Sequence, residues 1–220
     1  MPQRARRHRL VIATSNPHKI DEFRQIIDDD HWDLVAPEEV GIRDLEVVED
    51  GETYHENAAK KARAYANACG LPALADDSGL EVDALDGQPG IYSARYAGVD
   101  STGATSPAMS QDVANRRKLL QALRDVPRDQ RGARFRAIVA IAFPYGPNLR
   151  YGEGTVEGRI AEDERGASGF GYDPIFELPD GRRMAELSRD EKNAISHRGR
   201  AVRNAQWALD ALATALNRTD

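Results

Sequence analysis

Two adjacent carboxylates, Asp76 and Asp77, come directly after a short apolar run at residues 72–75 and directly before a Ser-Gly pair. An alternating run at residues 80–85 follows, so the pattern predicts two strands joined by a turn. Successive side chains of extended backbone point to opposite sides, so only one of the two aspartates can easily face a given cavity. Asp-Asp-Ser-Gly is also typical of an ordinary surface turn. A role in chemistry therefore depends on what the rest of the chain brings to this pair.

A second candidate site lies near the start of the chain, where residues 10–14 predict a buried strand and residues 14–19 read Thr-Ser-Asn-Pro-His-Lys. Asn16 is a good helix N-cap, and Pro17 suits the first helical position. The free backbone N–H groups and the positive end of the helix dipole favour a phosphate at such a helix start. Lys19 opposes the dipole, which indicates a bound anion. The alternative interpretation is a solvated lysine.

An acidic segment and an alanine-rich helix supply further charged groups. Residues 38–52 contain seven acidic side chains, which is typical of a solvated loop, and their spacing does not choose a metal ligand. Residues 52–69 predict a helix that Thr53 caps and Gly70 ends. Lys60 and Lys61 lie on this helix. Because most helical lysines are solvated, a functional lysine here needs other support.

Two later segments have residues suited to a nucleobase. Residues 166–176 are rich in glycine, which lets backbone approach a ligand closely, and Phe170 or Tyr172 offers a flat surface for a base. A plain glycine-rich loop is the alternative. His197 precedes an apolar helical stripe at residues 202–216, and a histidine at a helix start is more often structural than catalytic.

The elements that must position these residues alternate between strand and helix in the first half of the chain and include two long consecutive strands in the second half. This order favours an α/β fold around a mixed sheet over a pure Rossmann arrangement. The run at residues 135–143 is apolar at both parities, which predicts a central strand covered on both faces. The other expected elements are strands at residues 32–35 and 150–160 and an amphipathic helix at residues 113–123.

Composition excludes several classes of protein. The 220 residues carry a net charge of −6, which argues against general affinity for nucleic acid backbones. The single cysteine, Cys69, excludes an internal disulfide and fits a reducing compartment. No apolar run approaches the length of a membrane span, and the basic residues 1–9 lack a secretory apolar core, so we expect a disordered tail there. The GxGxxG and GxxxxGK[ST] patterns are absent, which removes most dehydrogenases and P-loop NTPases.

Together these residues favour hydrolysis of a polyphosphate over redox or acyl chemistry. Mg²⁺ takes oxygen ligands, usually one or two carboxylates with phosphate oxygens and water. The cation and the lysines would offset charge that builds on the phosphorus and its leaving group, while a carboxylate orients or deprotonates water. The sequence therefore predicts Mg²⁺-dependent hydrolysis of a nucleoside triphosphate.

Six long motifs occur in the order and spacing of one known family. From about residue 10 to residue 212 the chain resembles the inosine/xanthosine triphosphate pyrophosphatases, also called Ham1-type or RdgB-type. The departures are the basic N-terminal extension, Ser15 where the family often has glycine, and a longer loop at residues 100–109. The motifs are Thr14-Ser-Asn-Pro-His-Lys19, Glu56-Asn-Ala-Ala-Lys-Lys-Ala62, Ala75-Asp-Asp-Ser-Gly-Leu80, Gly87-Gln-Pro-Gly-Ile-Tyr-Ser-Ala-Arg-Tyr-Ala-Gly98, Gly169-Phe-Gly-Tyr-Asp-Pro-Ile-Phe176 and Glu191-Lys-Asn-Ala-Ile-Ser-His-Arg-Gly199.

The resemblance implies an α/β fold of the ITPase-like (Ham1/Maf-like) kind. In this fold a long mixed central sheet is flanked by helices, and one domain at residues 10–217 forms two lobes with a substrate cleft between them. The implied activity is hydrolysis of ITP, dITP and XTP to the monophosphate and pyrophosphate, with Mg²⁺ as cofactor, which removes these nucleotides from the pool. The family further implies a cytoplasmic homodimer. We expect no nucleic acid or membrane partner.

Roles carried over from the family by position divide the site among three regions. Asp77 would be the general base or water-orienting residue and a metal ligand. Glu49 would be the second metal carboxylate, although Glu46 and Asp50 lie near it. The triphosphate would be held by Thr14, Ser15, Asn16, Pro17, His18, Lys19 and Lys61, with Ser78 touching the substrate and Asp76 supporting the turn. The base pocket would contain Phe170, Gly171, Tyr172, Asp173, Lys192, His197 and Arg198.

A hydrogen-bond donor accounts for the implied preference for these bases. Hypoxanthine and xanthine carry an acceptor at position 6, where adenine carries an amino donor. A donor from Arg198 or from a backbone N–H at that position would pair with the keto group and reject adenine. Guanine has the same keto group, so its rejection needs a further feature that the sequence does not show.

Three rival interpretations remain at this point. A Maf-type pyrophosphatase has a similar fold, but its motifs differ from those at residues 169–176 and 196–198. A nucleotide-binding regulator without catalysis is the second, and the presence of Asp77, Lys19 and Lys61 argues against it. A nucleic-acid-binding protein is the third, and the acidic balance of the chain disfavours it.

Overall fold

The computed structural model describes residues 7–27, 30–98 and 110–219. The chain divides into two compact units, each assembled from separate segments. Unit 1 contains residues 1–77, 137–154 and 198–220, and unit 2 contains residues 78–136 and 155–197. Both units thus depend on segments that are far apart in the sequence.

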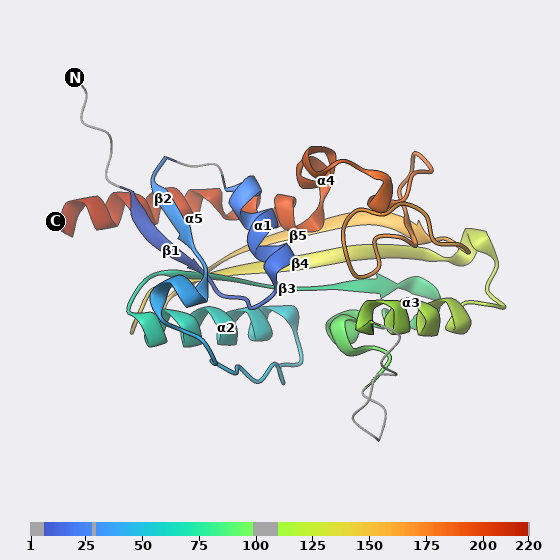
Figure 1. The fold of residues 1–220 in the computed structure, drawn as a ribbon, viewed down its shortest axis with the longest axis horizontal. Helices are drawn as coiled ribbons and strands as arrows, with labels where there is room; N and C mark the ends of the chain where they lie inside the picture. Colours follow the sequence, from blue (N-terminus) through green and yellow to red (C-terminus); the bar gives the residue numbers. More distant parts are fainter. Residues whose placement is uncertain (1–6, 28–29, 99–109, 220) are drawn as a thin grey trace. The chain divides into compact units, whose positions relative to one another are not determined.

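A six-stranded sheet has the strand order β2-β1-β3-β4-β5-β6 (Figure 1). β1 (His8–Ile12) is parallel to both of its neighbours, β2 (Trp32–Val35) and β3 (Ala73–Val82). By contrast, β5 (Leu149–Ile160) pairs with β6 (Phe176–Glu177) in antiparallel orientation. The sheet is therefore mixed, as the order of elements in the sequence predicted.

Unit 1 has helices on both faces of its strands. α1 (Pro17–Ile26) and α5 (His197–Thr219) share one hydrophobic core with β1, β3 and β4 (Gly132–Ala142). α2 (Tyr54–Cys69) lies on the opposite side of these strands (Figure 1). All residues from 137 to 142 are buried, which confirms the prediction of a central strand covered on both faces.

The helix ends of unit 1 follow the capping residues that the sequence contains. The Asn16 side chain accepts a hydrogen bond from the His18 N–H, and Pro17 is the first helical residue of α1. Thr53 accepts from the Glu56 N–H at the start of α2, and Gly70 ends that helix with φ +68°. Each cap satisfies backbone groups that a helix end leaves without a partner.

Unit 2 has a hydrophobic core of its own. Its members come from the second half of β3, the first half of β4, β5, β6 and α3 (Gln111–Ala122). The short helix α4 (Arg189–Ile195) begins at a capping box in which Ser188 and Glu191 bond to each other's backbone N–H groups. Short 3₁₀ turns at Pro37–Val40, Asp83–Leu85, Gly90–Arg95, Arg128–Gln130 and Met184–Glu186 complete the connections of the two units.

Two sequence expectations differ from the structure. β3 is one uninterrupted strand of ten residues, so the turn predicted at the Ser-Gly pair is wrong. Turn propensity is overridden here because Asp76 and Asp77 find partners while the backbone stays extended. The first strand begins at His8 because His8 pairs with Trp32, so two residues assigned to the tail belong to the sheet. The rest of the tail, at residues 1–6, and the loop at residues 99–109 lie outside the described residues.

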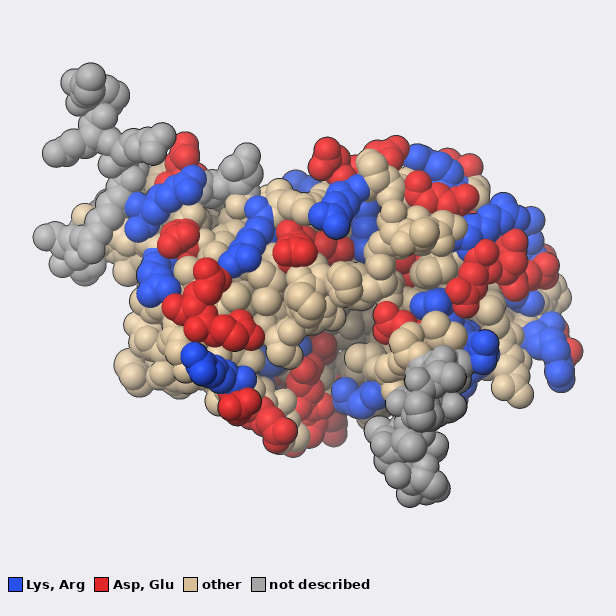
Figure 2. All heavy atoms as spheres, in the orientation of Figure 1, with Lys and Arg blue, Asp and Glu red and all other residues tan. Residues whose placement is uncertain are grey.

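The surface carries both signs of charge. Acidic and basic side chains are interspersed over the face drawn in Figure 2. Within the described ranges, none of the helices combines the length and the apolar character that a bilayer crossing requires.

Candidate active site

Seven charged side chains of unit 1 are connected to one another around β3. They come from α1, the acidic segment, α2, β3 and the first turns of α5. We refer to this set as the charged cluster. Its members are Lys19, Glu22, Glu49, Lys61, Asp76, Asp77 and Arg198.

Asp76 is the part of the charged cluster that cations surround most closely. Lys19 Nζ donates to Asp76 Oδ1 at 3.0 Å, and Arg198 Nε and Nη2 donate to Oδ2 at 3.1 and 2.9 Å. The side chains of Asp76 and Arg198 are 0% and 1% exposed. Burial alone would raise the pKa of Asp76, but Arg198 and Lys19 hold it well below its usual range. Asp76 is therefore a charged group that fixes two cations in place.

Asp77 has different partners from Asp76, as expected for adjacent residues of a strand. Asn57 Nδ2 donates to Asp77 Oδ2 at 3.1 Å. Lys61 Nζ lies 3.8 Å from Asp77 Oδ1 and 2.8 Å from Glu49 Oε2. Burial raises the pKa of Asp77 and Glu49 adds to the effect, while Lys61 opposes it. This carboxylate is thus more basic than an ordinary aspartate, which suits a group that orients or deprotonates water.

The structure separates Lys61 from its neighbour Lys60. Lys61 is only 9% exposed, whereas the Lys60 side chain is 44% exposed and pairs with Asp50 at the surface. Burial alone would lower the pKa of Lys61, but the carboxylates of the charged cluster outweigh burial and raise it. Lys61 is therefore a buried cation beside Asp77, and its predicted contact with phosphate stays a prediction.

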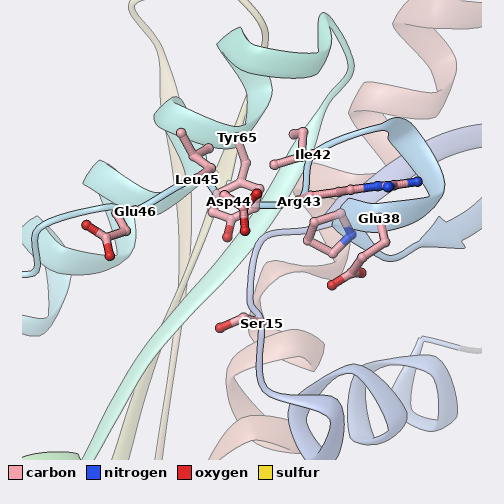
Figure 3. Close-up of a pocket in the computed structure, with 9 residues that line it drawn as sticks. Ser15, Glu38, Ile42, Arg43, Asp44, Leu45, Glu46 and Tyr65 are labelled. Atoms are coloured by element: carbon pink, nitrogen blue, oxygen red, sulfur yellow. The ribbon is translucent and has the colours of Figure 1, made fainter.

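The structure also gives different partners to the carboxylates of the acidic segment at residues 38–52. Glu49 reaches Lys61, while Asp50 binds Lys60. Glu46 instead lines a cavity of about 500 Å³ together with Ser15, Glu38, Asp44 and Tyr65 (Figure 3). The lining contains three carboxylates and one guanidinium, that of Arg43, so its excess of negative charge does not suit an unshielded triphosphate. Among the alternatives that the spacing left open, Glu49 is the one next to Asp77.

The carboxylates of Glu49 and Asp77 fit a shared magnesium ion. Both approach the same ammonium group, Lys61 Nζ, and both supply the hard oxygen ligands that Mg²⁺ prefers. Within the part of the chain that the structure describes, no three His, Cys, Asp or Glu side chains gather in a metal-binding group. Two carboxylates are the usual protein share of a Mg²⁺ site, where phosphate oxygens and water supply the other ligands.

The turn at residues 14–19 is shaped by local hydrogen bonds. Thr14 Oγ1 accepts from the Asn16 N–H at 3.2 Å, and Asn16 Oδ1 accepts from the His18 N–H at 2.9 Å. Ser15, Pro17 and His18 are exposed. Lys19 is the residue of this turn whose charge joins the charged cluster, and the anion that it meets is Asp76.

A loop at residues 169–173 of unit 2 is built around the Asp173 carboxylate. Asp173 Oδ2 accepts from the Phe170 N–H at 2.9 Å and from Lys192 Nζ at 2.7 Å. Lys192 Nζ also lies 4.8 Å from the centre of the Phe170 ring. A Cβ at Gly169 would lie 2.1 Å from Asp173 Oδ2, so only glycine allows this close approach. The charged pair therefore holds Phe170 in a defined position.

The structure favours Phe170 over Tyr172 as the surface for a base. Tyr172 is buried in the core of unit 2, and its hydroxyl donates to the Ser93 carbonyl at 2.8 Å. Phe170 is only half-buried. His197 begins α5, is buried, and stacks on Phe135 at 4.9 Å between ring centres.

The role predicted for Arg198 in base recognition stays a prediction, and the structure adds which groups its guanidinium contacts. The sequence motif implied a donor for position 6 of the purine, but the guanidinium is buried in unit 1 against Asp76 and Glu22. A donor that already faces two carboxylates in a dry environment gains little by turning to a keto group. Both donors that the sequence left open, Arg198 and a backbone N–H, therefore stay predictions, and the ion pairs of Arg198 favour the backbone N–H.

The other predicted site residues fall into two sets. Thr14 to Lys19, Glu49, Lys61 and Asp77 belong to unit 1, and Ser78, Phe170 to Asp173, Lys192 and His197 belong to unit 2. The cleft expected between two lobes stays a prediction. Sequence reasoning missed Glu22 and Asn57, which bind Arg198 and Asp77. Glu22 stands three residues after Lys19, a spacing that places both on one helix face, so this signal was available.

Comparison with known proteins gives a consistent result. The sequence model of the Ham1 family matches residues 10–207. The dITP/XTP pyrophosphatase of Bacillus subtilis is 45% identical over 202 residues, which cover 91% of this chain and 96% of the relative. The dITP/XTP pyrophosphatase of Yersinia pseudotuberculosis is 47% identical over 209 residues, covering 94% and 99%. The solved structure of a HAM1 protein from Coxiella burnetii has a TM-score of 0.75 at 40% identity and covers 96% of this chain and 99% of its own.

Proposed function

This chain belongs to the Ham1 family, and we propose that it hydrolyses the non-standard purine nucleotides dITP, XTP and ITP to the nucleoside monophosphate and pyrophosphate. The relatives that carry the name dITP/XTP pyrophosphatase match nearly the whole chain, so the assignment covers the entire fold. The observation that carries the chemistry is the placement of Lys61 between Asp77 and Glu49.

Asp77 is the group that prepares water for attack in this proposal. Its carboxylate, which Asn57 holds and Lys61 approaches, can orient the attacking water and take the proton that the water loses. The bond between the α and β phosphates then breaks, and pyrophosphate leaves with its negative charge. Lys61 and Lys19 oppose the charge that develops on the phosphate oxygens.

Mg²⁺ would be held by Asp77 and Glu49 and would supply positive charge to the triphosphate when bound. Asp76 acts indirectly in this proposal. By pairing with Lys19 and Arg198, its carboxylate fixes the direction of the Lys19 side chain. The turn at residues 14–19 then presents that lysine and its helix start to the phosphates.

Base recognition falls to the loop at residues 169–173. The Phe170 ring offers a stacking surface. Lys192 contacts both that ring and Asp173 and so holds them in position. A backbone N–H directed at position 6 would accept hypoxanthine or xanthine and reject adenine, because two donors would then face each other.

The assay that tests this function uses a panel of nucleoside triphosphates with separate detection of pyrophosphate and orthophosphate. We expect pyrophosphate from dITP, ITP and XTP, with little from dATP or dGTP, and loss of activity in EDTA that Mg²⁺ restores. Orthophosphate as the main product would overturn the proposal. Binding of dITP without turnover would instead support the regulator interpretation.

We further propose that the active form is a homodimer and that it works in the cytoplasm, where the nucleotide pool lies. Both points derive from the family resemblance. Light scattering after size-exclusion chromatography measures the first, and cell fractionation measures the second. A monomer with full activity would contradict the dimer as a requirement.

A further inference from the structure

We propose that Asp112 and Arg116 of α3 are positioning residues for base selection, because they bind both backbone polar groups of Gly171. The Gly171 N–H donates to Asp112 Oδ2 at 2.8 Å, and Arg116 Nη1 donates to the Gly171 carbonyl oxygen at 2.8 Å. The two side chains stand four residues apart, so they project from one face of α3. This inference rests on the proposed function, in which the loop at residues 169–173 recognises the base.

Gly171 is the position where the loop needs this support. Its φ of +59° lies in the left-handed region, and among the residues that the structure describes, other than Gly171 and its two chain neighbours, none has an atom within 4 Å of the place where a Cβ would stand. One side of Gly171 is thus held by α3 while another side is open to a close approach by a ligand. The neighbours on either side along the chain are Phe170 and Tyr172, so a shift of Gly171 would move the stacking ring.

Arg116 is built into unit 2 as a fixed donor. Its side chain is 10% exposed, and its guanidinium pairs with the exposed Glu164: Nη2 donates to Oε2 at 3.1 Å, while Nε lies 3.0 Å from Oε1 without a hydrogen bond among the described residues. The ion pair holds the planar guanidinium in one orientation and directs Nη1 at Gly171. A hydrogen bond from a charged donor in a largely dry environment is stronger than one between neutral groups.

The same face of α3 also holds the segment to which Tyr172 is attached. Asn115 Nδ2 donates to the carbonyl oxygens of Ser93 and Ala94 at 3.2 and 3.1 Å, and Tyr172 donates to the same Ser93 oxygen at 2.8 Å. α3 therefore fixes Gly171 directly and Tyr172 through Ser93. Phe170 and Asp173 flank these two anchored residues.

Loss of either α3 contact to Gly171 should loosen base recognition without removing the groups that attack phosphorus. Asp77, Lys61 and Lys19 belong to unit 1 and keep their own partners. The expected signature is a higher KM for dITP and a weaker preference for dITP over dATP, with kcat much less affected.

The test compares Asp112→Ala and Arg116→Met with the unaltered chain in pyrophosphate release from dITP and dATP. Each variant should raise KM for dITP about tenfold and lower the dITP-over-dATP ratio of kcat/KM by a similar factor, with kcat within about threefold. Asp112→Asn keeps an oxygen that can accept the Gly171 N–H, so its KM should stay within about threefold of the unaltered chain. Arg124→Met removes an arginine with a 77% exposed side chain just beyond α3 and should leave KM unchanged.

Binding without turnover provides the second readout. In Asp112→Ala and in Arg116→Met, the Kd of inosine monophosphate should rise about tenfold, while the Kd of inorganic pyrophosphate changes by less than about twofold. If Arg116→Met fails to fold, Arg116→Lys keeps the charge at Glu164 but loses the planar fork, and the same rise in KM is expected.

Unchanged KM and base preference in folded variants would overturn the inference. A fall in kcat that follows the loss of folded protein, at constant KM, would also overturn it, because it would show a purely structural role. Failure of the proposed function has a different outcome, because the unaltered chain itself would then release no pyrophosphate from dITP.

Discussion

The charged cluster of unit 1 and the loop at residues 169–173 of unit 2 are held together by different forces. In the charged cluster, buried ion pairs dominate. Asp76, for example, contacts both Lys19 and Arg198. The loop contains the buried ion pair of Lys192 with Asp173, and the described hydrogen bonds to the backbone N–H and carbonyl groups of Phe170 and Gly171 also fix it. The charged cluster thus depends mainly on ion pairs between side chains, and the loop depends mainly on hydrogen bonds to its backbone.

The difference matches what each region would recognise in the proposed function. A triphosphate is a concentrated charge that changes during reaction, so preorganised charges act on it most strongly in the transition state. A purine base is neutral and must be distinguished by the position of one or two hydrogen-bonding groups, which depends on accurate backbone placement. Changes in the charged cluster should therefore act on turnover and stability, and changes in the loop should act on KM and selectivity.

The largest effect is expected from Asp77→Asn. The amide cannot accept a proton from water, so kcat for dITP should fall by about 10³-fold, near the middle of the usual range for a lost general base. Pyrophosphate release at saturating dITP measures the loss, and a thermal melt checks that the fold is retained. A variant that keeps more than a tenth of the turnover would remove Asp77 from the role of base.

Arg198→Met should destabilise the fold by about 3–5 kcal/mol, because the buried Asp76 loses one of its two cations and keeps only Lys19, while the half-buried Glu22 loses Arg198 as its partner. Urea unfolding measures the change. Arg182→Met is the matched control, since that arginine also pairs with two carboxylates but is 48% exposed, and should cost less than about 1 kcal/mol. Equal losses would contradict this contrast. Unchanged stability with loss of the dITP-over-dATP preference would return Arg198 to base recognition.

The adjacent lysines of α2 allow a direct test of burial. Lys61→Met should lower kcat/KM for dITP by about 10²-fold, because a buried cation beside the reacting phosphates is lost. Lys60→Met should change it by less than about twofold, since a surface ion pair contributes little. Steady-state kinetics of both variants, prepared together, provides the measurement. Similar losses at the two positions would show that Lys61 has no special place in the site.

Lys192→Met should have the smallest effect on turnover of the site variants, although it also lowers stability because the buried Asp173 carboxylate loses its cation. It removes the cation from Asp173 and from the Phe170 ring, so KM for dITP should rise about tenfold while kcat changes less. The measurement is the change in KM relative to the change in kcat, determined for Lys192→Met and for Lys61→Met. A fall in kcat at constant KM would place Lys192 with the catalytic charges and blur the division between the two regions.

Much of the fold could be predicted because it depends on local signals. Asn16, Thr53 and Gly70 mark helix ends that the structure confirms. The strand at residues 135–143 was recognisable because a strand covered on both faces must be apolar at both parities. The turn at the Ser-Gly pair failed as a prediction because local propensity was outweighed by the partners that β3 meets in the sheet and in the charged cluster.

The site was predicted unevenly for a similar reason. Asp77, Lys61 and Glu49 stand in motifs, and the structure brings these three together. Arg198 also stands in a motif, but it is buried against Asp76 and Glu22. These two partners lie 122 and 176 positions before it in the sequence. Asp112 and Arg116 gave no signal, because a charged residue that binds a distant backbone group looks like any residue of an amphipathic helix.

The sequence by itself determined the residue types that can do the chemistry, the ends of the main helices and the family to which the chain belongs, since each of these is written in short stretches of neighbouring residues. Only the tertiary structure decided which charges are buried and what each of them contacts. Burial and pairing arise when distant segments pack together, and they change the free energy of a charge far more than any sequence neighbour does. For this reason two adjacent aspartates, and two adjacent lysines, have different environments in one molecule.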